Sequence, residues 1–388
     1  MFIKYFKRLT YLTLVLLACL AMASCQEDPV PTPPATHRTV LVYMIADNSL
    51  GRGNYDADDI AEMKSAAAAG GLNGGRLLVY RAPAGTEAGK ETPVLLEVTE
   101  TGEVLTLKNY DNSLYSIDVE RMQQVTRDVK ALAPAPEYGL ILWSHGNGWE
   151  EGSKSRSFGQ EGSSGYTMKI SSLAKGLEEF HPGFIYFDCC LMATVEVAYE
   201  LRHATDAIIA SGTELLSEGT RYDYNVPLFF ADRFSAEEVA QTTFDYFASY
   251  SGYYQTCTMS VINTAGLDRL ADVTREIMKT GAEPTVSLDY QQSYMVGSAS
   301  SIYDMQRYIE TLDCGSELKD KWHEALKGVV SLALTTPRLF GSFKMTYYCG
   351  LGTFILTSAK DADYRGYRNQ AWWQDVVSFH PVYNPTAN

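Results

Sequence analysis

The hydrophobic pattern of this chain alternates between two periods. Continuous apolar runs, typical of strands buried on both faces, occur at residues 39–46, 76–80, 138–143, 184–188 and 207–211. Between these runs, apolar positions at helical spacing predict helices over residues 56–69, 118–132, 171–180 and 193–202. Strand and helix follow each other with short connections, which predicts an α/β fold: a mostly parallel sheet with helices on both faces.

Further elements extend this pattern and then change it. Two short β segments at 94–98 and 103–108 predict a hairpin, and a helix over 236–249, a strand over 256–262 and a helix over 267–278 continue the alternation. After residue 280 the pattern is mainly helical, with late strands expected near 344–348 and 352–356. We therefore divide the chain into an α/β domain over 38–280 and a C-terminal helical and β region over 281–388 that packs on it.

The first 24 residues have the pattern of a targeting segment. Lys4, Lys7 and Arg8 precede an apolar run from Leu9 to Ala23, which is shorter than the ~20 residues that a membrane-spanning helix needs. Small residues then lead to Cys25, as in a bacterial lipobox. We predict a lipoprotein signal peptide over 1–24, cut before a lipidated Cys25. An ordinary secretory signal with an incidental Cys25 is the alternative, ahead of a retained membrane helix.

Residues 25–37 predict an extended linker behind that anchor. Four of the chain's 14 prolines lie in it, and such a segment holds a domain away from a surface. Residue 26 is Gln, so the aspartate that retains lipoproteins at the inner membrane of enteric bacteria is absent. We expect the protein in the cell envelope, anchored by lipid at the outer membrane or cell surface.

Composition narrows the range of partners. The 388 residues include 32 basic and 47 acidic side chains, a net charge of −15, which argues against nucleic acid as a partner because phosphate binding needs a basic surface. Hydrophobic residues make up 46% of the chain, enough for a sizeable core. Seven cysteines are too few for a disulfide scaffold in a chain of this length.

Two strand ends carry reactive side chains. His145 follows the run 138–143 in the block Trp-Ser-His-Gly-Asn-Gly, and Cys190 follows the run 184–188 in Asp-Cys-Cys-Leu-Met. One predicted helix separates the two runs, which places them on neighbouring parallel strands with both ends at one sheet edge. A thiol needs a nearby base to act as a nucleophile near neutral pH, and Gly146 would let a substrate carbonyl approach its backbone amide.

These pieces together resemble the clostripain family of cysteine peptidases, in the same clan as caspases, gingipains and legumain. The resemblance covers residues 38–380 and rests on Val42–Asn48, Trp143–Gly148, Asp188–Ala193 and Val195–Leu201. It implies a caspase-like α/β core and a cysteine endopeptidase acting on proteins or peptides. His145 and Cys190 would form the catalytic dyad, and the amides of Gly146 and Cys190 would bind the oxyanion. Asp188 would line the pocket for an Arg or Lys side chain before the scissile bond.

The two adjacent cysteines must be distinguished. The family pattern Asp-Ala-Cys puts Cys189 at the alanine place and Cys190 at the nucleophile place. Strand alternation agrees, because residues two apart point to the same side, so Asp188 and Cys190 share a side while Cys189 points into packing. A nearby carboxylate raises the pKa of a thiol, a cost that a bound basic substrate would offset. We favour Cys190 and keep Cys189 as the alternative nucleophile.

Other features of the pocket stay open between two interpretations. Asp47 and Asn48 end the first strand at the same edge and either border the pocket or form Asx hydrogen bonds at a turn. Leu215 and Leu216 would narrow the pocket, and Arg221 would neutralise Asp188 if it reached the site. Strict Arg/Lys specificity is therefore in doubt even where peptidase chemistry is intact.

The polar loop between Trp149 and Tyr166 suggests regulation. It contains Lys154 and Arg156, basic residues that the enzyme itself would recognise, and relatives are activated by cleavage in this region. Autoprocessing at Lys154 or Arg156 is one hypothesis. An ordinary exposed loop that happens to hold two basic residues is the other.

Cofactor signals are weak. Zinc is disfavoured because close Cys-x-x-Cys and His-x-x-x-His spacings are absent, and the resemblance requires no cofactor. Some relatives need calcium, so Ca²⁺ stays open, although no EF-hand loop occurs. We predict a secreted, lipid-anchored cysteine endopeptidase that cleaves after Arg or Lys. The rivals are a non-catalytic surface lipoprotein with the same fold and a cysteine-dependent transferase or ligase.

Overall fold

The computed structural model describes residues 36–151, 157–162, 165–296 and 301–385. Residues Thr36–Asn388 form one compact unit. The predicted signal peptide (1–24), the lipidated Cys25, most of the linker and the candidate cleavage residues Lys154 and Arg156 lie outside the described residues. Those predictions therefore have no structural counterpart here.

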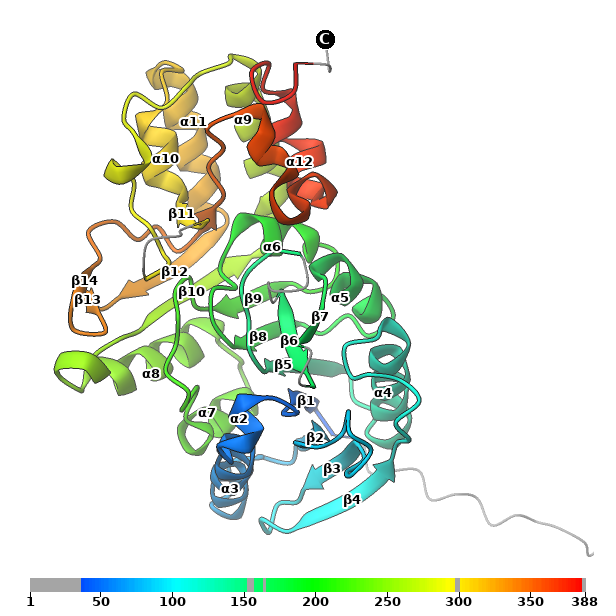
Figure 1. Ribbon diagram of the computed structural model, residues 1–388. Coiled ribbons are helices and arrows are strands. Elements are labelled where there is room, and N and C mark those ends of the chain that lie inside the picture. The colour runs from blue at the N-terminus through cyan, green and yellow to red at the C-terminus, as the bar shows by residue number, and fades with distance from the viewer. Residues whose placement is uncertain (1–35, 152–156, 163–164, 297–300, 386–388) are drawn as a thin grey trace, which may run out of the picture. The chain divides into compact units, whose positions relative to one another are not determined.

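A nine-stranded sheet forms the centre of this unit (Figure 1). Five strands run parallel in the order β2-β1-β5-β8-β9. Their bounds are β1 (Arg38–Ile45), β2 (Arg76–Ala82), β5 (Glu137–Trp143), β8 (Phe184–Asp188) and β9 (Ala207–Ala210). These strands match the apolar runs of the sequence, and they lie at the middle of the sheet because both of their faces are apolar.

Antiparallel strands extend the sheet on both sides. β3 (Val94–Val98) and β4 (Val104–Asn109) form the predicted hairpin beside β2, and β10 (Thr258–Asn263) and β12 (Val330–Thr335) lie beyond β9. The prediction that the strand near 256–262 continues the parallel pattern is wrong. Two helices, α7 (Tyr222–Phe229) and α8 (Ala236–Ala248), connect β9 to β10. β10 begins at the sheet edge where β9 ends, so the two strands are antiparallel.

Alternating side chains of the central strands face two helical layers. Val40, Val42 and Met44 of β1 pack in one core with α3 (Tyr55–Ala68), α7 and α8, which lie together on one side of the sheet in Figure 1. Leu41, Tyr43 and Ile45 pack in the other core. That core also contains α4 (Val119–Leu132), α5 (Ile170–Leu177), α6 (Val195–Glu200) and α9 (Leu267–Lys279). The predicted α/β class, with helices on both faces, is confirmed.

The C-terminal residues are built into the same unit. The helices α10 (Met305–Thr311), α11 (Ser316–Lys327) and α12 (Ala371–Asp375) add Trp322, Trp372 and other side chains to the core shared with α9. β12 is the outermost strand of the main sheet. Where we expected strands near 344–348 and 352–356, β14 (Phe343–Lys344) and β15 (Gly352–Thr353) have two residues each. The domain boundary at residue 280 stays a prediction.

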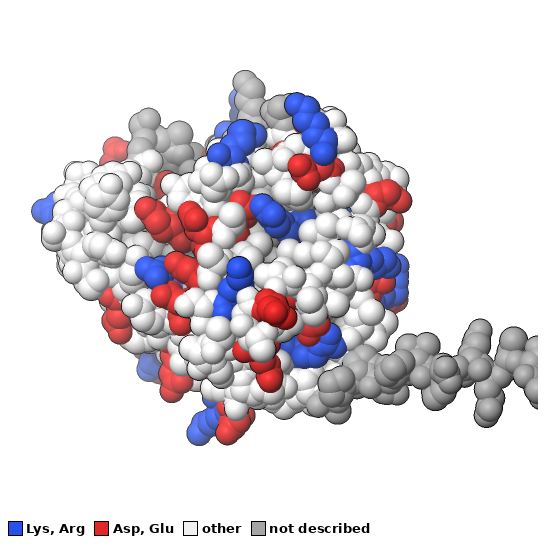
Figure 2. All heavy atoms as spheres, turned by 90° about the horizontal axis from the view of Figure 1, so that it is seen from below, with Lys and Arg blue, Asp and Glu red and all other residues white. Residues whose placement is uncertain are grey.

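Helix length and surface charge in the described residues bear on contact with a membrane or with charged partners. Within the ranges that the structure describes, no helix has the length and apolar character needed to cross a bilayer. On the face seen in Figure 2, Lys and Arg side chains are interspersed with Asp and Glu.

Candidate active site

One cavity at the carboxyl edge of the sheet brings the two predicted catalytic residues together. β5 and β8 are adjacent and parallel, with Trp143 opposite Asp188, so the segments that carry His145 and Cys190 leave the sheet side by side. Both residues line a cavity of about 230 Å³. The other lining residues are Leu50, Trp143, Ser144, Asp188, Cys189, Glu214, Leu215, Leu216, Ser217 and Gly219.

The two cysteines have different surroundings. Cys189 is 4% exposed and belongs to the core that contains Phe187, whereas the Cys190 side chain is half-buried and packs with a separate small cluster that includes Leu191. The Leu215 amide donates to Cys190 Sγ at 3.3 Å. Cys190 is therefore the more exposed residue of the pair.

Burial controls the protonation of both thiols. Loss of solvent raises the pKa of Cys190 to about 11, the hydrogen bond from Leu215 opposes this shift, and the charges of Glu214 and Asp188 add to it. Burial raises the pKa of Cys189 well above its ordinary value. Burial therefore favours the protonated Cys190 thiol at neutral pH, and a nearby base or positive charge would favour its thiolate.

A short strand braces the backbone around His145. β6 (Phe158–Glu161) lies against the loop that follows β5: the Gly159 amide donates to His145 O at 2.9 Å, and the Gln160 amide donates to Ser144 Oγ at 3.1 Å. The imidazole itself lies beside α2 (Ser49–Arg52), with Nε2 at 2.8 Å from Ser49 Oγ. The position of His145 therefore depends on three separate segments of the chain.

Gly146 allows the two strand ends to approach each other. A Cβ atom added to Gly146 would stand 2.6 Å from Cys190 O and 3.0 Å from Cys189 Sγ, closer than side chains tolerate. The backbone of Gly146 thus lies directly against that of Cys190. The two residues whose amides were predicted to bind the oxyanion therefore lie in segments that touch at this edge of the sheet.

Asp188 lies in the cavity wall with a fixed carboxylate. It is 5% exposed, and its two oxygens accept hydrogen bonds from the Thr220 amide and the Tyr222 hydroxyl, both at 3.0 Å. Burial raises the pKa of Asp188 to about 6, and these hydrogen bonds oppose the shift. Gly219 (φ +58°) lies so close that a Cβ atom would be 2.7 Å from Oδ1.

Arg221 is engaged away from Asp188. Its guanidinium bonds to Glu62 at 2.8 Å and to Asp223 at 2.7 Å, beside the Tyr246 hydroxyl. The condition under which Arg221 would neutralise Asp188 is therefore not met in this structure. Leu215 and Leu216 do line the cavity.

Asp47 and Asn48 are not among the described residues that line the cavity. The Asp47 carboxylate accepts hydrogen bonds from the amides of Gly85 and Glu87, at 2.8 and 2.7 Å. The Asn48 side chain is buried, caps α2 through Leu50 N and donates to Ile45 O. Asn48 therefore makes an Asx-type hydrogen bond at the turn, Asp47 binds the separate segment at residues 85–87, and neither residue lines the cavity.

Sequence reasoning missed three neighbours of the site. Ser49 contacts the imidazole, Glu214 lines the cavity, and Asp59 of α3 accepts a hydrogen bond from Trp143 Nε1 at 2.6 Å. Burial, together with the charge of Asp188, raises the pKa of Asp59 far above its ordinary value, which favours the protonated carboxyl. The N-cap pattern Asn48-Ser49 is the one signal that could have drawn attention to Ser49.

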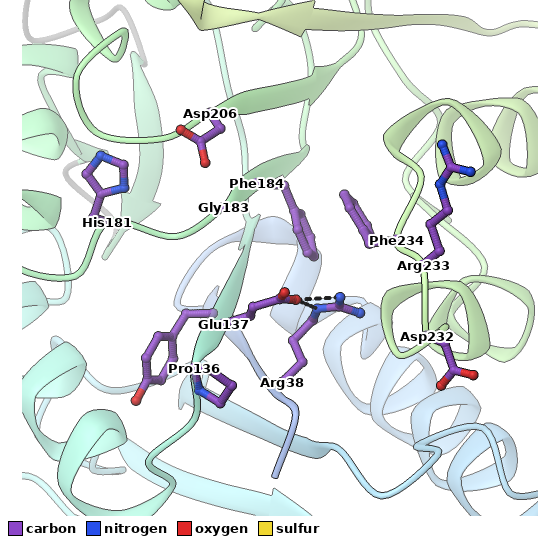
Figure 3. A pocket seen from close by; sticks show the side chains of 11 residues that line it. Arg38, Pro136, Glu137, His181, Gly183, Phe184, Asp206, Asp232, Arg233 and Phe234 are labelled. Carbon is purple, nitrogen blue, oxygen red and sulfur yellow. Dashed lines mark hydrogen bonds and ion pairs between the residues drawn. The ribbon is translucent and has the colours of Figure 1, made fainter.

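A larger hollow lies at the opposite, amino edge of the sheet (Figure 3). Its volume is about 530 Å³, and its lining includes Arg38, Glu137 and Phe184, which begin β1, β5 and β8. Arg38 and Glu137 form an ion pair at 2.6 Å, so these two charges neutralise each other. Of these two cavities, the smaller one is the one that both His145 and Cys190 line.

Cysteine pairing and metal sites were left open by the sequence. Cys314 and Cys349 are free thiols, as are the other cysteines in the described ranges. Among the described residues, no group of three or more His, Cys, Asp and Glu side chains is arranged to hold a metal ion. The need for Ca²⁺ stays a prediction.

Comparison with known proteins decides the family. A model of the clostripain family matches residues 42–333, three quarters of the chain. The chain belongs to this family. It is therefore a clostripain-like cysteine peptidase, and its substrates are proteins or peptides. A search of curated proteins finds no match.

Solved structures of other clostripain-like peptidases share the fold. An inactive zymogen C11 protease from Parabacteroides distasonis is 28% identical with a TM-score of 0.76, over 88% of this chain and 99% of its own. A secreted C11 cysteine protease from Bacteroides thetaiotaomicron, in complex with an irreversible peptide inhibitor, is 28% identical with a TM-score of 0.76, over 87% and 98%. The caspase-like fold predicted for this clostripain-family chain is confirmed.

Proposed function

We propose that this peptidase hydrolyses peptide bonds with a His145/Cys190 dyad. The observation that supports it is the cavity at the ends of β5 and β8 that both residues line; Cys189 also lines it, but Cys189 is buried in the core whereas Cys190 is half-buried. His145 takes the thiol proton, and the Cys190 thiolate attacks the carbonyl carbon. The amides of Gly146 and Cys190 donate to the resulting oxyanion.

Both halves of the reaction use the same base. When the tetrahedral intermediate collapses, the imidazolium of His145 gives its proton to the leaving amine, and the acyl group remains as a thioester on Cys190. A water molecule then loses a proton to His145 and attacks the thioester. The products are a free carboxylate, a free amine and the regenerated thiol, so every proton is accounted for.

The pocket chemistry supports cleavage after Arg or Lys. The Asp188 carboxylate is held by Thr220 and Tyr222 in the cavity wall, and Glu214 adds a second carboxylate to that wall. Leu215 and Leu216 offer apolar surface for the methylene stem of a long basic side chain. A bound cation lowers the pKa of both Asp188 and Cys190, so the basic substrate assists formation of the thiolate that attacks it.

Cleavage of fluorogenic peptides by residues 26–388 tests this proposal. Peptides ending in Arg, Lys, Asp, Asn or Leu are compared on the parent chain and on its Cys190→Ala, Cys189→Ala and His145→Ala variants. We expect turnover after Arg or Lys that disappears in Cys190→Ala and His145→Ala and persists in Cys189→Ala. Activity that follows Cys189 would overturn the dyad, and cleavage after other residues alone would overturn the pocket assignment. Parallel runs with EDTA and with added Ca²⁺ show whether calcium is needed.

A transferase or ligase would share the thioester intermediate. Adding a free amine nucleophile to the same assay separates the two classes, since a transferase joins the amine to the acyl group whereas a peptidase releases the acid. We favour hydrolysis because the structures similar to this chain are described as proteases.

We further propose that the chain is exported and anchored by lipid on Cys25. The support is the lipobox-like sequence before Cys25, the Pro-rich linker after it, and a structural relative that is described as secreted. Incorporation of labelled palmitate by the whole chain, lost in Cys25→Ser, is the expected result. Unlabelled protein that is still exported would favour the ordinary secretory signal.

Autoprocessing at Lys154 or Arg156 is also part of the proposal. One relative is described as an inactive zymogen, and both residues fit the basic specificity proposed here. Intact-mass measurement should show cleavage after one of these residues in the parent chain and none in Cys190→Ala. A fully active single chain would overturn it.

A further inference from the structure

The Ser49 hydroxyl contacts the His145 imidazole, and the proposed dyad gives this hydroxyl no role. Ser49 Oγ lies 2.8 Å from His145 Nε2, although 96 positions separate the two residues in the chain. Ser49 is exposed and begins the four-residue helix α2, immediately after the N-cap Asn48.

A buried network fixes the distance between Ser49 and His145. Asn48 Nδ2 donates to Ser144 Oγ at 3.2 Å, and these two residues directly precede Ser49 and His145. Asn48 Nδ2 also donates to Ile45 O at 2.8 Å and to Gln160 O at 2.9 Å, which ties the network to β1 and β6. The Asn48 and Ser144 side chains are buried and bonded to backbone atoms. They fix the backbone next to Ser49 and His145, so the position of the Ser49 hydroxyl does not depend on its rotamer alone.

This arrangement has a chemical consequence for the ring. A neutral imidazole carries its proton on one nitrogen, and the partner of that nitrogen decides which tautomer forms. If the Ser49 oxygen accepts, Nε2 keeps its hydrogen both in the neutral ring and in the imidazolium. The Nδ1 nitrogen is then the one that exchanges protons with the thiol, the leaving amine and the water.

We propose that Ser49 is a positioning residue of the His145/Cys190 dyad, whose hydroxyl accepts the Nε2–H hydrogen and so selects the tautomer and orientation of the catalytic imidazole. The inference rests on the proposed peptidase function. Ser49 transfers no proton and forms no covalent bond. The hydroxyl also stabilises the imidazolium, because a hydrogen bond to the charged form favours that form. A peptide that covers the cavity shields this hydrogen bond from water and strengthens it.

Steady-state kinetics of Ser49→Ala and Ser49→Thr test the role. For Ser49→Ala we expect kcat to fall about tenfold with KM changed less than about twofold, because a correctly oriented acid–base group contributes at least this much. The acidic limb of kcat/KM should move about 0.5 pH unit or more to lower pH, since the imidazolium loses an acceptor and the pKa of His145 falls. Ser49→Thr keeps the hydroxyl and should restore both. Ser65→Ala, an exposed serine on α3, is the matched control and should behave as the parent chain.

Two kinetic results would overturn the inference. If Ser49→Ala is as active as the parent chain with an unchanged pH profile, Ser49 has no positioning role. If Ser49→Ala is more active, the hydroxyl donates to Nε2 and holds the ring away from the thiol, which also overturns the inference.

A measurement independent of turnover separates this inference from the function that it rests on. In protein labelled with ¹⁵N-histidine, the ring nitrogens of His145, assigned by comparison with His145→Asn, should report the Nε2–H tautomer and a pKa that falls in Ser49→Ala. An unchanged tautomer and pKa would overturn the inference even in an active enzyme. An inactive parent chain with the expected titration would overturn the catalytic role while leaving the hydrogen bond established.

Discussion

At the scale of single residues, Asp188 shows how one position serves both fold and site. It pairs with Trp143 as the last residue of β8 and then presents its carboxylate to the cavity, where Thr220 and Tyr222 each occupy one oxygen. Burial raises the pKa of this carboxylate to about 6, so part of it is protonated near neutral pH. Under the proposed specificity, a basic substrate side chain would restore the carboxylate charge, so Asp188 would favour binding of cationic over neutral substrates.

Replacing Asp188 with Asn tests this role. The substitution keeps the size of the side chain and removes its charge, so kcat/KM for peptides ending in Arg should fall about 30- to 300-fold. Peptides ending in Leu serve as the internal control and should lose less than about threefold. Equal losses on both substrates would show that Asp188 acts on the dyad or on folding and not on specificity.

The same carboxyl predicts a pH dependence for the parent chain. Asp188 ionises with a pKa of about 6, above its ordinary value because of burial, and only the ionised form attracts a cation. As the pH falls below about 6, KM for Arg peptides should therefore rise by up to tenfold per pH unit. KM measured from pH 5 to pH 8 checks this. An Arg-peptide KM that stays flat through pH 6, or one that rises equally for Leu peptides, would contradict it.

At the scale of elements, α3 docks on the sheet through a carboxyl that is protonated at neutral pH. Asp59 accepts the Trp143 indole hydrogen at 2.6 Å, and burial beside Asp188 raises its pKa to about 9, against an ordinary value of 3.8. In the unfolded chain Asp59 loses its proton near pH 4. Between about pH 4 and pH 9 the folded state therefore binds more protons, and rising pH favours unfolding.

The Asp59→Asn variant should remove this dependence. An amide oxygen can still accept from Trp143, and it does not titrate. From pH 5 to pH 8 the parent chain should lose up to roughly 1.4 kcal/mol of unfolding free energy per pH unit through Asp59, whereas the variant should lose less. Urea unfolding at several pH values measures both slopes. Identical slopes would show that Asp59 is already ionised in the folded protein.

The junction of β5 and β8 gives a second prediction at this scale. Gly146→Ala places a Cβ atom 2.6 Å from Cys190 O, so the two strand ends must separate. We expect a stability loss of about 1–3 kcal/mol and an activity loss of about 100-fold or more. The control is Gly183→Ala, just before β8 at its other end, where the nearest atom to the new Cβ is Tyr138 O at 3.8 Å. Full activity in Gly146→Ala would contradict the proposed oxyanion arrangement.

The strands also show why sequence patterns predicted some elements and missed others. β1, β5 and β8 were predictable because burial on both faces leaves an uninterrupted apolar run. β12 was missed because it is an edge strand whose side chains are only partly buried, so no such run forms. The direction of β10 depends on how two preceding helices pack, which no local pattern records. In the site, the preference for Cys190 over Cys189 rests on local sequence and stays a prediction, whereas the contact of Ser49 with His145 arises from tertiary structure alone.

At the scale of the whole molecule, the segment 152–156 divides the sheet in two. The strands β1 to β5 precede it and β8, β9, β10 and β12 follow it, and the two groups meet only where β5 pairs with β8. His145 belongs to the first group and Cys190 to the second. A chain cut in this segment would thus carry its proposed dyad on two polypeptides.

Such a cut should not separate the two pieces. Before it, Glu151 bonds to Lys169 at 2.8 Å and to Asn369 at 3.0 Å, and after it, the Gly159 amide is bonded to His145 O. We expect protein nicked between residues 152 and 156 to elute as one particle in size-exclusion chromatography and to show two bands on a denaturing gel. Treatment with urea is the control that releases the pieces. Elution as two particles without denaturant would show that the junction is too weak to hold a processed enzyme together.

The place where the chain enters the compact unit has a mechanical consequence. Thr36 is bonded to Gly74 O at 2.6 Å just before β1, at the edge of the sheet that carries Arg38 and Glu137, whereas the cavity lies at the far ends of the strands. The eight residues of β1 span about 26 Å between these edges. A pull on the chain ahead of Thr36 would therefore load the hydrogen-bond ladders on both sides of β1 first, at the sheet edge opposite the cavity.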